Sequence, residues 1–378
     1  MPNPNAIVSR TIRFDPPLDR APAEALRAEL GLSVGLEGDR RIRLDPDDRR
    51  SVGFVRVLDT LAKRRKPVYL EIDPATNTIS RLRIPMVAWV TEIRPGASGI
   101  LEIRLHPSHA RHALPLGEED SAALERELRG ALERRRPVLV VEDDRNRIID
   151  VREFTPDPEA PLPPFPEPGV PPRLPPQPWP RPWRWVQIPI EIVIRWLLLP
   201  WRWFTCPTLV TAQHIFDEMA ATSCDPLTVP PPCIPFLYPE NGCWARAHEM
   251  ARLMIEKGYS PRKVWIDGIL HVKTANSPYC FVDWGWHVAP ILCVRVNAIK
   301  TEMMVIDPSL FITPVTEKDW KHEQGDPKAT LTESDAGQFW PWGGTDPTYS
   351  QTNDFLDDYR LDLYNRANNL GPPPYACP

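Results

Sequence analysis

A cysteine, a histidine and an aspartate in the C-terminal half of this sequence could together carry out nucleophilic catalysis. Cys243 stands where a loop gives way to a helical pattern, His287 opens an apolar run, and Asp307 ends a strand-like run. A thiol attacks an acyl or amide carbon efficiently when an imidazole takes its proton and a carboxylate orients that imidazole. The three residue types therefore indicate acyl or amide chemistry, provided that the fold brings them together.

Cys243 is predicted to lie in the first turn of a helix over residues 243–257, which Gly258 ends. One face of this helix is apolar and carries Ala247, Met250 and Met254 behind the cysteine. The opposite face carries charged residues, namely Arg246, Glu249, Arg252 and Glu256. Unpaired N–H groups and the positive end of a helix favour a thiolate and an oxyanion at this place. On this segment alone, a buried structural cysteine is an equally good interpretation.

His287 and Asp307 are expected to lie on neighbouring antiparallel strands. The apolar run over 288–294 predicts a strand buried on both faces, with His287 at its mouth. Asp307 could then accept the N–H of one ring nitrogen and leave the other nitrogen facing Cys243. Pro290 interrupts the strand, which we therefore expect to be bulged there or to lie at a sheet edge. Taken singly, a histidine bonded to backbone groups and an ordinary turn aspartate are the alternatives.

The elements that must position these residues fall within residues 206–378, which we predict to be an α+β domain. A helix bearing the cysteine is expected to pack on an antiparallel sheet. The strand-like runs of this sheet cover 263–266, 269–274, 279–282, 287–296 and 303–306. After Ser309 the regular pattern fades, which indicates loops and short elements. Three aromatic residues near the candidate triad could wall an acyl pocket, or could simply be core: Trp244, Trp284 and Trp286.

Residues 1–154 are predicted to form a small α+β domain with an internal duplication. Ala62-Lys63-Arg64-Arg65-Lys66-Pro67-Val68 resembles Leu132-Glu133-Arg134-Arg135-Arg136-Pro137-Val138. Both stretches follow a helical pattern and lead into a strand, a turn with Asp and Asn, and a returning strand. This helix–hairpin repeat contains no nucleophile, phosphate loop or metal spacing that would indicate a function. The crowded His106, His109 and His112 are interpreted as part of a solvated loop rather than as a metal site.

Two unusual segments separate these domains. Residues 155–182 are dense in proline and are interpreted as a semi-rigid linker. Residues 183–205 are apolar and rich in tryptophan, but charged residues and prolines keep the apolar runs too short to cross a bilayer. Contact of residues 183–204 with a membrane surface is the less favoured alternative to packing against a domain.

Composition excludes several classes of protein. The formal charge of −5 gives no reason to expect a nucleic-acid partner. The seven cysteines contain no CxxC pair, so a zinc ribbon is not expected, and Cys224 could pair with Cys233 or remain a separate thiol. The N-terminus lacks the basic and apolar regions of a signal peptide, which indicates a cytoplasmic protein or export by a non-classical route. Oligomeric state is not indicated.

Four segments, in this order, resemble the bacterial protein-glutaminases, a family of protein-glutamine deamidases. The segments are Cys233-Ile234-Pro235-Phe236, Gly242-Cys243-Trp244-Ala245-Arg246-Ala247-His248, Trp286-His287-Val288-Ala289 and Ile306-Asp307-Pro308-Ser309-Leu310-Phe311. The resemblance covers about residues 206–315. It departs from the family in having Trp244 where a tyrosine is usual.

The resemblance implies a papain- or transglutaminase-like core with a Cys-His-Asp triad. Cys243 would be the nucleophile, His287 the general base and acid, and Asp307 the orienting carboxylate. The implied reaction converts protein-bound glutamine to glutamate and ammonia through a Cys thioester, on protein or peptide substrates and with no metal or other cofactor. The alternatives are a transglutaminase or a thiol peptidase on the same core, and a non-enzymatic interaction protein.

Overall fold

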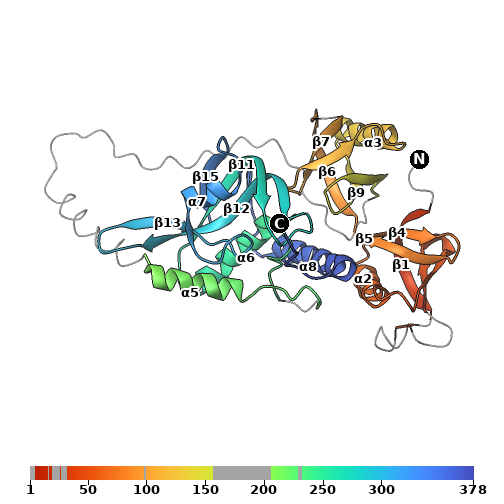
Figure 1. The fold of residues 1–378 in the computed structure, drawn as a ribbon, viewed down its shortest axis with the longest axis horizontal. Coiled ribbons are helices and arrows are strands. Elements are labelled where there is room, and N and C mark those ends of the chain that lie inside the picture. The colour runs from red at the N-terminus through yellow and green to blue at the C-terminus, as the bar shows by residue number, and fades with distance from the viewer. Residues whose placement is uncertain are drawn as a thin grey trace.

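The computed structural model describes residues 5–15, 17–18, 26, 32–97, 99–155, 206–228 and 232–378. Two small units come from the N-terminal half of the chain, and one larger unit of helices and an antiparallel sheet comes from the C-terminal half (Figure 1). The fold is therefore α+β, as the sequence predicts. From residue 156 onward, the proline-rich linker and the Trp-rich segment 183–205 lie outside the described residues.

The first unit is a closed five-stranded barrel with one helix packed against it. The strand order is β1-β2-β3-β5-β4, and helix α2 (Ser51–Lys63) contacts β1 and β4. The strands are β1 (Ala6–Asp15), β2 (Leu32–Leu36), β3 (Arg41–Leu44), β4 (Pro67–Asp73) and β5 (Thr78–Arg83). A short 3-10 turn, η1 (Glu37–Asp39), joins β2 to β3. The helix is amphipathic, and its apolar face, which includes Phe54 and Leu58, fills the barrel core.

The second unit is an open five-stranded sheet with its own apolar core and one helix, α3 (Ser121–Arg134). The strand order is β10-β9-β6-β7-β8. The strands are β6 (Met86–Pro95), β7 (Ile100–His106), β8 (His112–Pro115), β9 (Pro137–Glu142) and β10 (Ile148–Glu153). In both units a helix is followed by an antiparallel hairpin, α2-β4-β5 in the first and α3-β9-β10 in the second.

The larger unit is built on an antiparallel sheet of order β14-β13-β12-β11-β15. The strands are β11 (Arg262–Lys273), β12 (Phe281–Arg295), β13 (Thr301–Val305), β14 (Val315–Thr316) and β15 (Thr330–Asp335). Helices α5 (Leu209–Ala220) and α6 (Cys243–Glu256) pack with one apolar cluster of the sheet. Helix α7 (Glu317–Glu323) packs through Trp320 with the other cluster. A small hairpin of β16 (Gln338–Trp340) and β17 (Gly343–Thr345) contacts α6.

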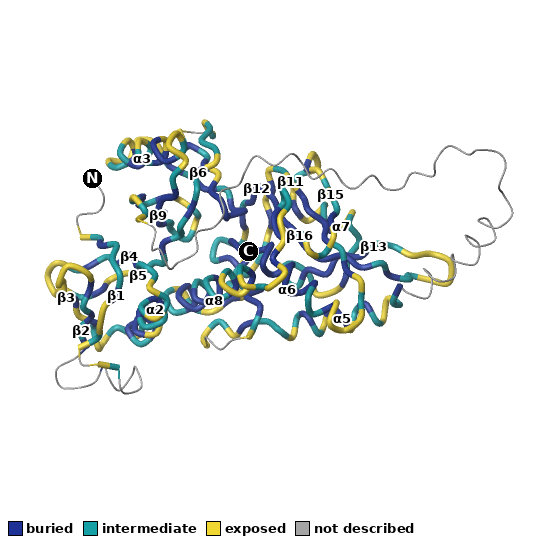
Figure 2. Tube along the Cα trace, turned by 180° about the vertical axis from the view of Figure 1, so that it is seen from behind, coloured by how far each residue is buried: buried dark blue, intermediate teal, exposed yellow. Residues whose placement is uncertain are grey.

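Helix α8 (Ser350–Leu370) lies between α6 and α2 and joins the N-terminal barrel to the larger unit (Figures 1 and 2). Its residues Leu356 and Tyr359 belong to the apolar cluster around α6, whereas Leu361 and Tyr364 belong to the barrel core. The prediction of loops and short elements after Ser309 was therefore wrong for residues 350–370. Because α8 is buried on more than one side, its apolar residues follow no single stripe that would reveal a helix.

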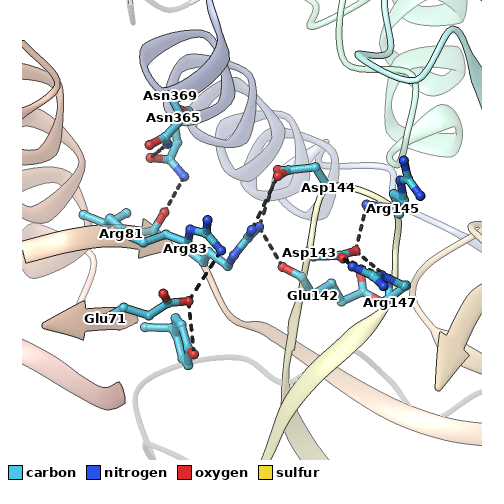
Figure 3. Close-up of polar contacts among 12 residues, drawn as sticks. Glu71, Arg81, Arg83, Glu142, Asp143, Asp144, Arg145, Arg147, Asn365 and Asn369 are labelled. Atoms are coloured by element: carbon cyan, nitrogen blue, oxygen red, sulfur yellow. Dashed lines mark hydrogen bonds and ion pairs between the residues drawn. The ribbon is translucent and has the colours of Figure 1, made fainter. Parts of the chain in front are cut away.

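Polar contacts between the three bodies surround the β5–β6 connection (Figure 3). Arg83 of β5 donates to the Glu142 carbonyl (3.0 Å) and pairs with Asp144 (3.4 Å), both in the second unit. Asn365 of α8 donates to the carbonyl of Leu82 (3.2 Å). Each backbone carbonyl buried at these contacts thus receives a side-chain donor.

Pro290 lies in a central strand, contrary to the expected edge or bulge. β12 pairs with β11 on one side and β13 on the other, and Pro290 stands opposite Lys263 in register. The Pro290 carbonyl accepts from the Ile306 N–H, just beyond the end of β13. The position where an N–H is missing faces the same side, where the pairing of β12 with β13 has ended, so no ladder hydrogen bond is lost there. The bulge of this strand pair lies elsewhere, between Asp267 and Leu270 of β11.

Six of the seven cysteines form disulfides. Cys224 is bonded to Cys233, the pairing that the sequence left open. The other two bonds, Cys206–Cys293 and Cys280–Cys377, close far longer stretches of chain. Cys243 is therefore the single free thiol of the protein. Among the described residues, no helix combines the length and apolar character needed to span a membrane.

Candidate active site

Cys243 occupies the first position of α6, directly after Gly242 in a left-handed conformation (φ 83°). A side chain at residue 242 would meet the ring of Tyr359 at 2.3 Å, so both the backbone angle and the space require glycine. Asn241 accepts from the Gly242 N–H through its own side-chain oxygen (3.0 Å). The nucleophile candidate is thus held by a tight turn at the point where helix N–H groups are unpaired.

Arg246 supports this turn and is buried, although the helical pattern places it on the charged face of α6. Its guanidinium donates to the carbonyls of Asn241 and Tyr238, the latter at 3.0 Å. Glu249, on the same charged face, is also buried and is paired with Arg252. Helix α6 is therefore enclosed on more than its apolar face.

His287 and Asp307 form a buried pair next to Cys243. His287 Nε2 lies 2.9 Å from Asp307 Oδ2, and both residues are at most 2% exposed. The second ring nitrogen, Nδ1, has no hydrogen-bond partner among the described residues, and a ring nitrogen of His287 lies within 4.8 Å of the Cys243 sulfur. The structure thus brings together the three residues that sequence patterns single out.

Trp320 completes the surroundings of the pair. Its indole Nε1–H donates to the same Asp307 oxygen (3.0 Å), and the Ser309 N–H donates to the other oxygen (3.2 Å). The His287 ring is stacked between Trp284 (ring centroids 4.4 Å apart) and Trp320 (5.5 Å). This arrangement fixes the ring orientation of His287 and fills three hydrogen-bonding positions of the carboxylate.

The candidate pocket tryptophans lie at the site and are buried. Trp244 and Trp286 contact each other with ring centroids 5.7 Å apart, and both approach the ring of His109, as does Trp284. The indole nitrogens of Trp244 and Trp284 are buried with no hydrogen-bond partner among the described residues. Unpaired buried donors are unusual and indicate a place where a ligand group could accept.

A loop from the second N-terminal unit enters this site. We call residues 107–111, between β7 and β8, the inserted loop. The His109 carbonyl accepts from the Gly285 N–H (2.8 Å) and the Arg111 N–H donates to the Asp283 carbonyl (3.0 Å), so the loop adds to β12 like a short antiparallel strand. The His109 N–H also lies 3.4 Å from the Asn241 side-chain oxygen, beside the nucleophile.

The solvated-loop interpretation of the three histidines was wrong. His106, His109 and His112 are at most 3% exposed. His112 pairs with Glu142, His106 packs edge-on against Trp340 and Trp342, and His109 lies over the candidate nucleophile. The sequence around them contains Pro and Arg and resembles a surface loop, because its burial depends on a partner domain far along the chain.

Burial dominates the protonation of the site. It raises the pKa of the Cys243 thiol far above the usual range, against the opposing effects of Arg246 and of nearby backbone N–H groups. It also lowers the pKa of His287, although Asp307 favours the charged ring. Burial alone would raise the pKa of Asp307, but the charge and hydrogen bond of His287 and the bond from Trp320 lower it below its usual value.

Burial thus favours the neutral thiol and the neutral imidazole over the charged forms at this site. Sequence reasoning missed three contributors, namely Arg246 as a support, Trp320 as a donor to the carboxylate and His109 as an occupant of the site. Only Arg246 carried a signal, since it lies one helical turn from Cys243.

Comparison with known proteins points to one family. Residues 212–324, which contain the cysteine, histidine and aspartate, match a family model described as Glutaminase. A crystal structure of protein-glutaminase is 30% identical over 42% of this chain and 89% of that chain (TM-score 0.37), and an NMR structure of protein-glutaminase from Chryseobacterium proteolyticum is 30% identical over 41% and 89% (0.37). A crystal structure of pro-protein-glutaminase is 20% identical over 73% and 93% (0.48). No curated protein matches this chain.

Proposed function

Because this chain belongs to the protein-glutaminase family, we propose that it hydrolyses the side-chain amide of protein-bound glutamine to glutamate and ammonia. The observation that carries the proposal is the contact of His287 with Asp307 beside the single free thiol of the protein. This is the order of groups that activates a thiol toward an amide carbon.

In the proposed mechanism, His287 Nδ1 takes the proton of Cys243 and the sulfur attacks the carboxamide carbon. Backbone N–H groups at the start of α6 stabilise the oxyanion of the tetrahedral intermediate. His287 then gives its proton to the departing nitrogen, which leaves as ammonia, and a thioester remains. A water molecule, deprotonated by His287, opens the thioester and releases glutamate and the free thiol. Asp307 holds the imidazole in the required orientation throughout.

The three tryptophans are proposed to receive the substrate side chain. Trp244, Trp284 and Trp286 surround the space that the His109 ring fills in the closed form. The indole N–H groups of Trp244 and Trp284 have no hydrogen-bond partner among the described residues, and the carbonyl oxygen of a glutamine side chain is a suitable acceptor for such a group. A flat amide between aromatic walls is also sterically matched to this slot.

The full-length chain is proposed to be a latent form. The inserted loop bonds to β12 where an extended substrate would bind, and both Cys243 and His287 are 1% exposed. A protein substrate cannot reach the sulfur until the second N-terminal unit moves or is degraded. The assay must therefore compare the intact chain with a chain whose residues 1–155 have been digested by a protease.

The test is release of ammonia from a glutamine-rich protein, followed by mass spectrometry of that protein. Digested enzyme should release ammonia and convert glutamine to glutamate, and Cys243→Ala should abolish both. His271→Ala is the matched control, because His271 forms a similar His–Asp pair with Asp283 (2.8 Å) outside the site and should keep full activity. A crosslinked substrate would instead indicate a transglutaminase, and a cleaved substrate would indicate a peptidase. If no product depended on Cys243, the remaining interpretation would be a non-enzymatic interaction protein.

A further inference from the structure

His109, Cys243 and His287 form a cluster of metal-ligating atoms inside the closed site. One nitrogen of each ring and the sulfur all lie within 4.8 Å of one another. The three residues come from three separate elements, namely the inserted loop, α6 and β12, and each is 1% exposed. Soft sulfur and imidazole nitrogen are the ligands that zinc prefers in proteins.

The ring nitrogens of the cluster have few partners. Cys243 is in no disulfide, and His287 Nδ1 has no hydrogen-bond partner among the described residues. The His109 ring has the Pro239 backbone nearby, but neither of its nitrogens makes a hydrogen bond of good geometry to a described residue. Buried imidazole nitrogens without partners are rare, and a bound cation would satisfy them.

The surroundings resemble those of a metal ligand. The far nitrogen of His287 bonds to the Asp307 carboxylate, the carboxylate–histidine arrangement that orients ligands and raises their basicity at zinc sites. Zinc bound at about 2.0 Å from nitrogen and about 2.3 Å from sulfur separates its ligands by about 3.3–3.6 Å. The ligand atoms lie up to 4.8 Å apart, so the proposal requires side-chain rotations that shorten the longest separation by as much as about 1.2–1.5 Å.

Charge around the cluster is mixed. The Arg246 guanidinium donates to the Asn241 carbonyl beside Cys243, and the Asp307 carboxylate bonds to Nε2 of His287. Binding of zinc removes the thiol proton, so the ion adds one net positive charge rather than two.

We propose that the closed form binds one zinc ion through His109 Nδ1 or Nε2, Cys243 Sγ and His287 Nδ1, with a water molecule as fourth ligand. The ion would tie the inserted loop to the candidate nucleophile and so hold the chain latent. The binding itself needs only the geometry of the closed form, whereas its role in latency rests on the proposed function. Zinc would be lost when residues 107–111 leave the site, because one ligand leaves with them.

The test uses the full-length chain after treatment with a chelator and titration with zinc chloride. Metal content, proton release and the thermal unfolding midpoint are measured together. The wild-type chain should take up one zinc, release about one proton and unfold at a higher temperature. His109→Ala and His109→Gln should bind at least tenfold more weakly, and Asp307→Asn about 10–100-fold more weakly through loss of the orienting contact. His214→Ala, a change at an exposed helix surface, should bind like wild type.

The two His109 variants must keep the circular dichroism and unfolding cooperativity of wild type, and His109→Gln guards against a cavity effect in His109→Ala. No zinc uptake by the wild-type chain, or equal uptake by folded His109→Gln, would overturn the proposal. A chain that binds zinc but has no Cys243-dependent glutaminase activity after digestion would leave the metal site standing and refute the function. Glutaminase activity in a chain that binds no zinc would refute the metal site and leave the proposed function standing.

Discussion

At the scale of single residues, the carboxylate of Asp307 has the most constrained position in the site. One of its oxygens accepts from His287 and from Trp320, and the other accepts from the Ser309 N–H. Each bond favours the charged carboxylate and so favours the ring orientation that presents His287 Nδ1 to the sulfur. Trp320 acts on the reaction only through this contact, which makes it a positioning residue.

Replacing Trp320 with phenylalanine should keep the stacking on His287 and remove the indole N–H. A hydrogen bond to a charged group contributes about 1.5–3 kcal/mol, so we expect kcat to fall about tenfold or more. Trp320 lowers the pKa of Asp307, and losing its bond should raise that pKa and move the acidic limb of the pH–rate profile to higher pH. The measurement is the pH dependence of ammonia release by the digested enzyme.

Trp265→Phe is the matched control for this change. Trp265 is equally buried and also donates its indole N–H, but to Ser334 (2.8 Å) rather than to the site. Its variant should lose stability without moving the acidic limb. If both variants moved that limb equally, a positioning role for Trp320 would be untenable.

Residue patterns predicted part of this site and no more. Cys243 stands at the start of α6 and Asp307 follows the end of β13, where short-range signals such as a helix start or a strand end locate them. His287 was expected at the mouth of its strand but lies inside β12, because that strand begins at Phe281, where the alternating polar residues conceal it. Trp320 and His109 have no such signal. Trp320 reaches Asp307 from a short helix that the fading pattern after Ser309 concealed, and His109 reaches Cys243 only because two domains dock.

At the scale of elements, the entry to α6 determines where the sulfur lies. Gly242 and Gly258 flank this helix, and both adopt left-handed angles (φ 83° and 86°). They differ in surroundings, because a side chain at 242 would overlap the Tyr359 ring of α8, whereas one at 258 would meet nothing within 4 Å. The two positions therefore separate backbone strain from steric overlap.

Gly258→Ala should lower the free energy of unfolding by about 1–2 kcal/mol, the strain of a left-handed alanine. Gly242→Ala should lower the free energy of unfolding by the same strain and by a further amount of about 1–3 kcal/mol, because the new methyl group overlaps the Tyr359 ring. It should also reduce glutaminase activity, because the overlap displaces the start of α6. Urea unfolding of the two full-length variants provides the comparison, and equal losses at the two positions would contradict the steric argument.

Elements were predictable where an apolar face repeats with the period of a helix. Helix α6 has such a face and lies close to its predicted bounds of 243–257, although its charged face is also largely buried. Helix α8 does not, since its 21 residues are rich in Asn and Asp and contact two separate cores. The central position of Pro290 was also not predictable, because it depends on where the neighbouring strand β13 ends.

At the scale of the whole molecule, the N-terminal units and the larger unit form one closed assembly around a neutral thiol. The protein has one free cysteine, so alkylation of Cys243 reports directly on whether this assembly is open. Burial raises the pKa of the thiol, and the inserted loop blocks access to it. We expect removal of the loop to open access to the sulfur and to reduce its burial.

We expect iodoacetamide to label the native intact chain far more slowly than the digested chain at neutral pH. The experiment is done with a chelator present, so that a bound metal does not protect the sulfur. Mass spectrometry should find one label per digested chain, and Cys243→Ser should take none. Rapid labelling of the intact native chain, at the rate of the unfolded chain in urea, would show that the site is not closed.

Helix α8 has a consequence for how such an assembly can come apart. Leu361 and Tyr364 remain with the C-terminal part of the chain but belong to the apolar core of the N-terminal barrel. After a single cut between the two halves of the chain, the N-terminal barrel would still cover this apolar surface of α8. The cleaved fragment is therefore expected to stay bound. In the proposed latent form, we therefore expect that a single cut does not release the site and that degradation of the N-terminal barrel does. The exposed face of α8 would then be free to bind other apolar surfaces.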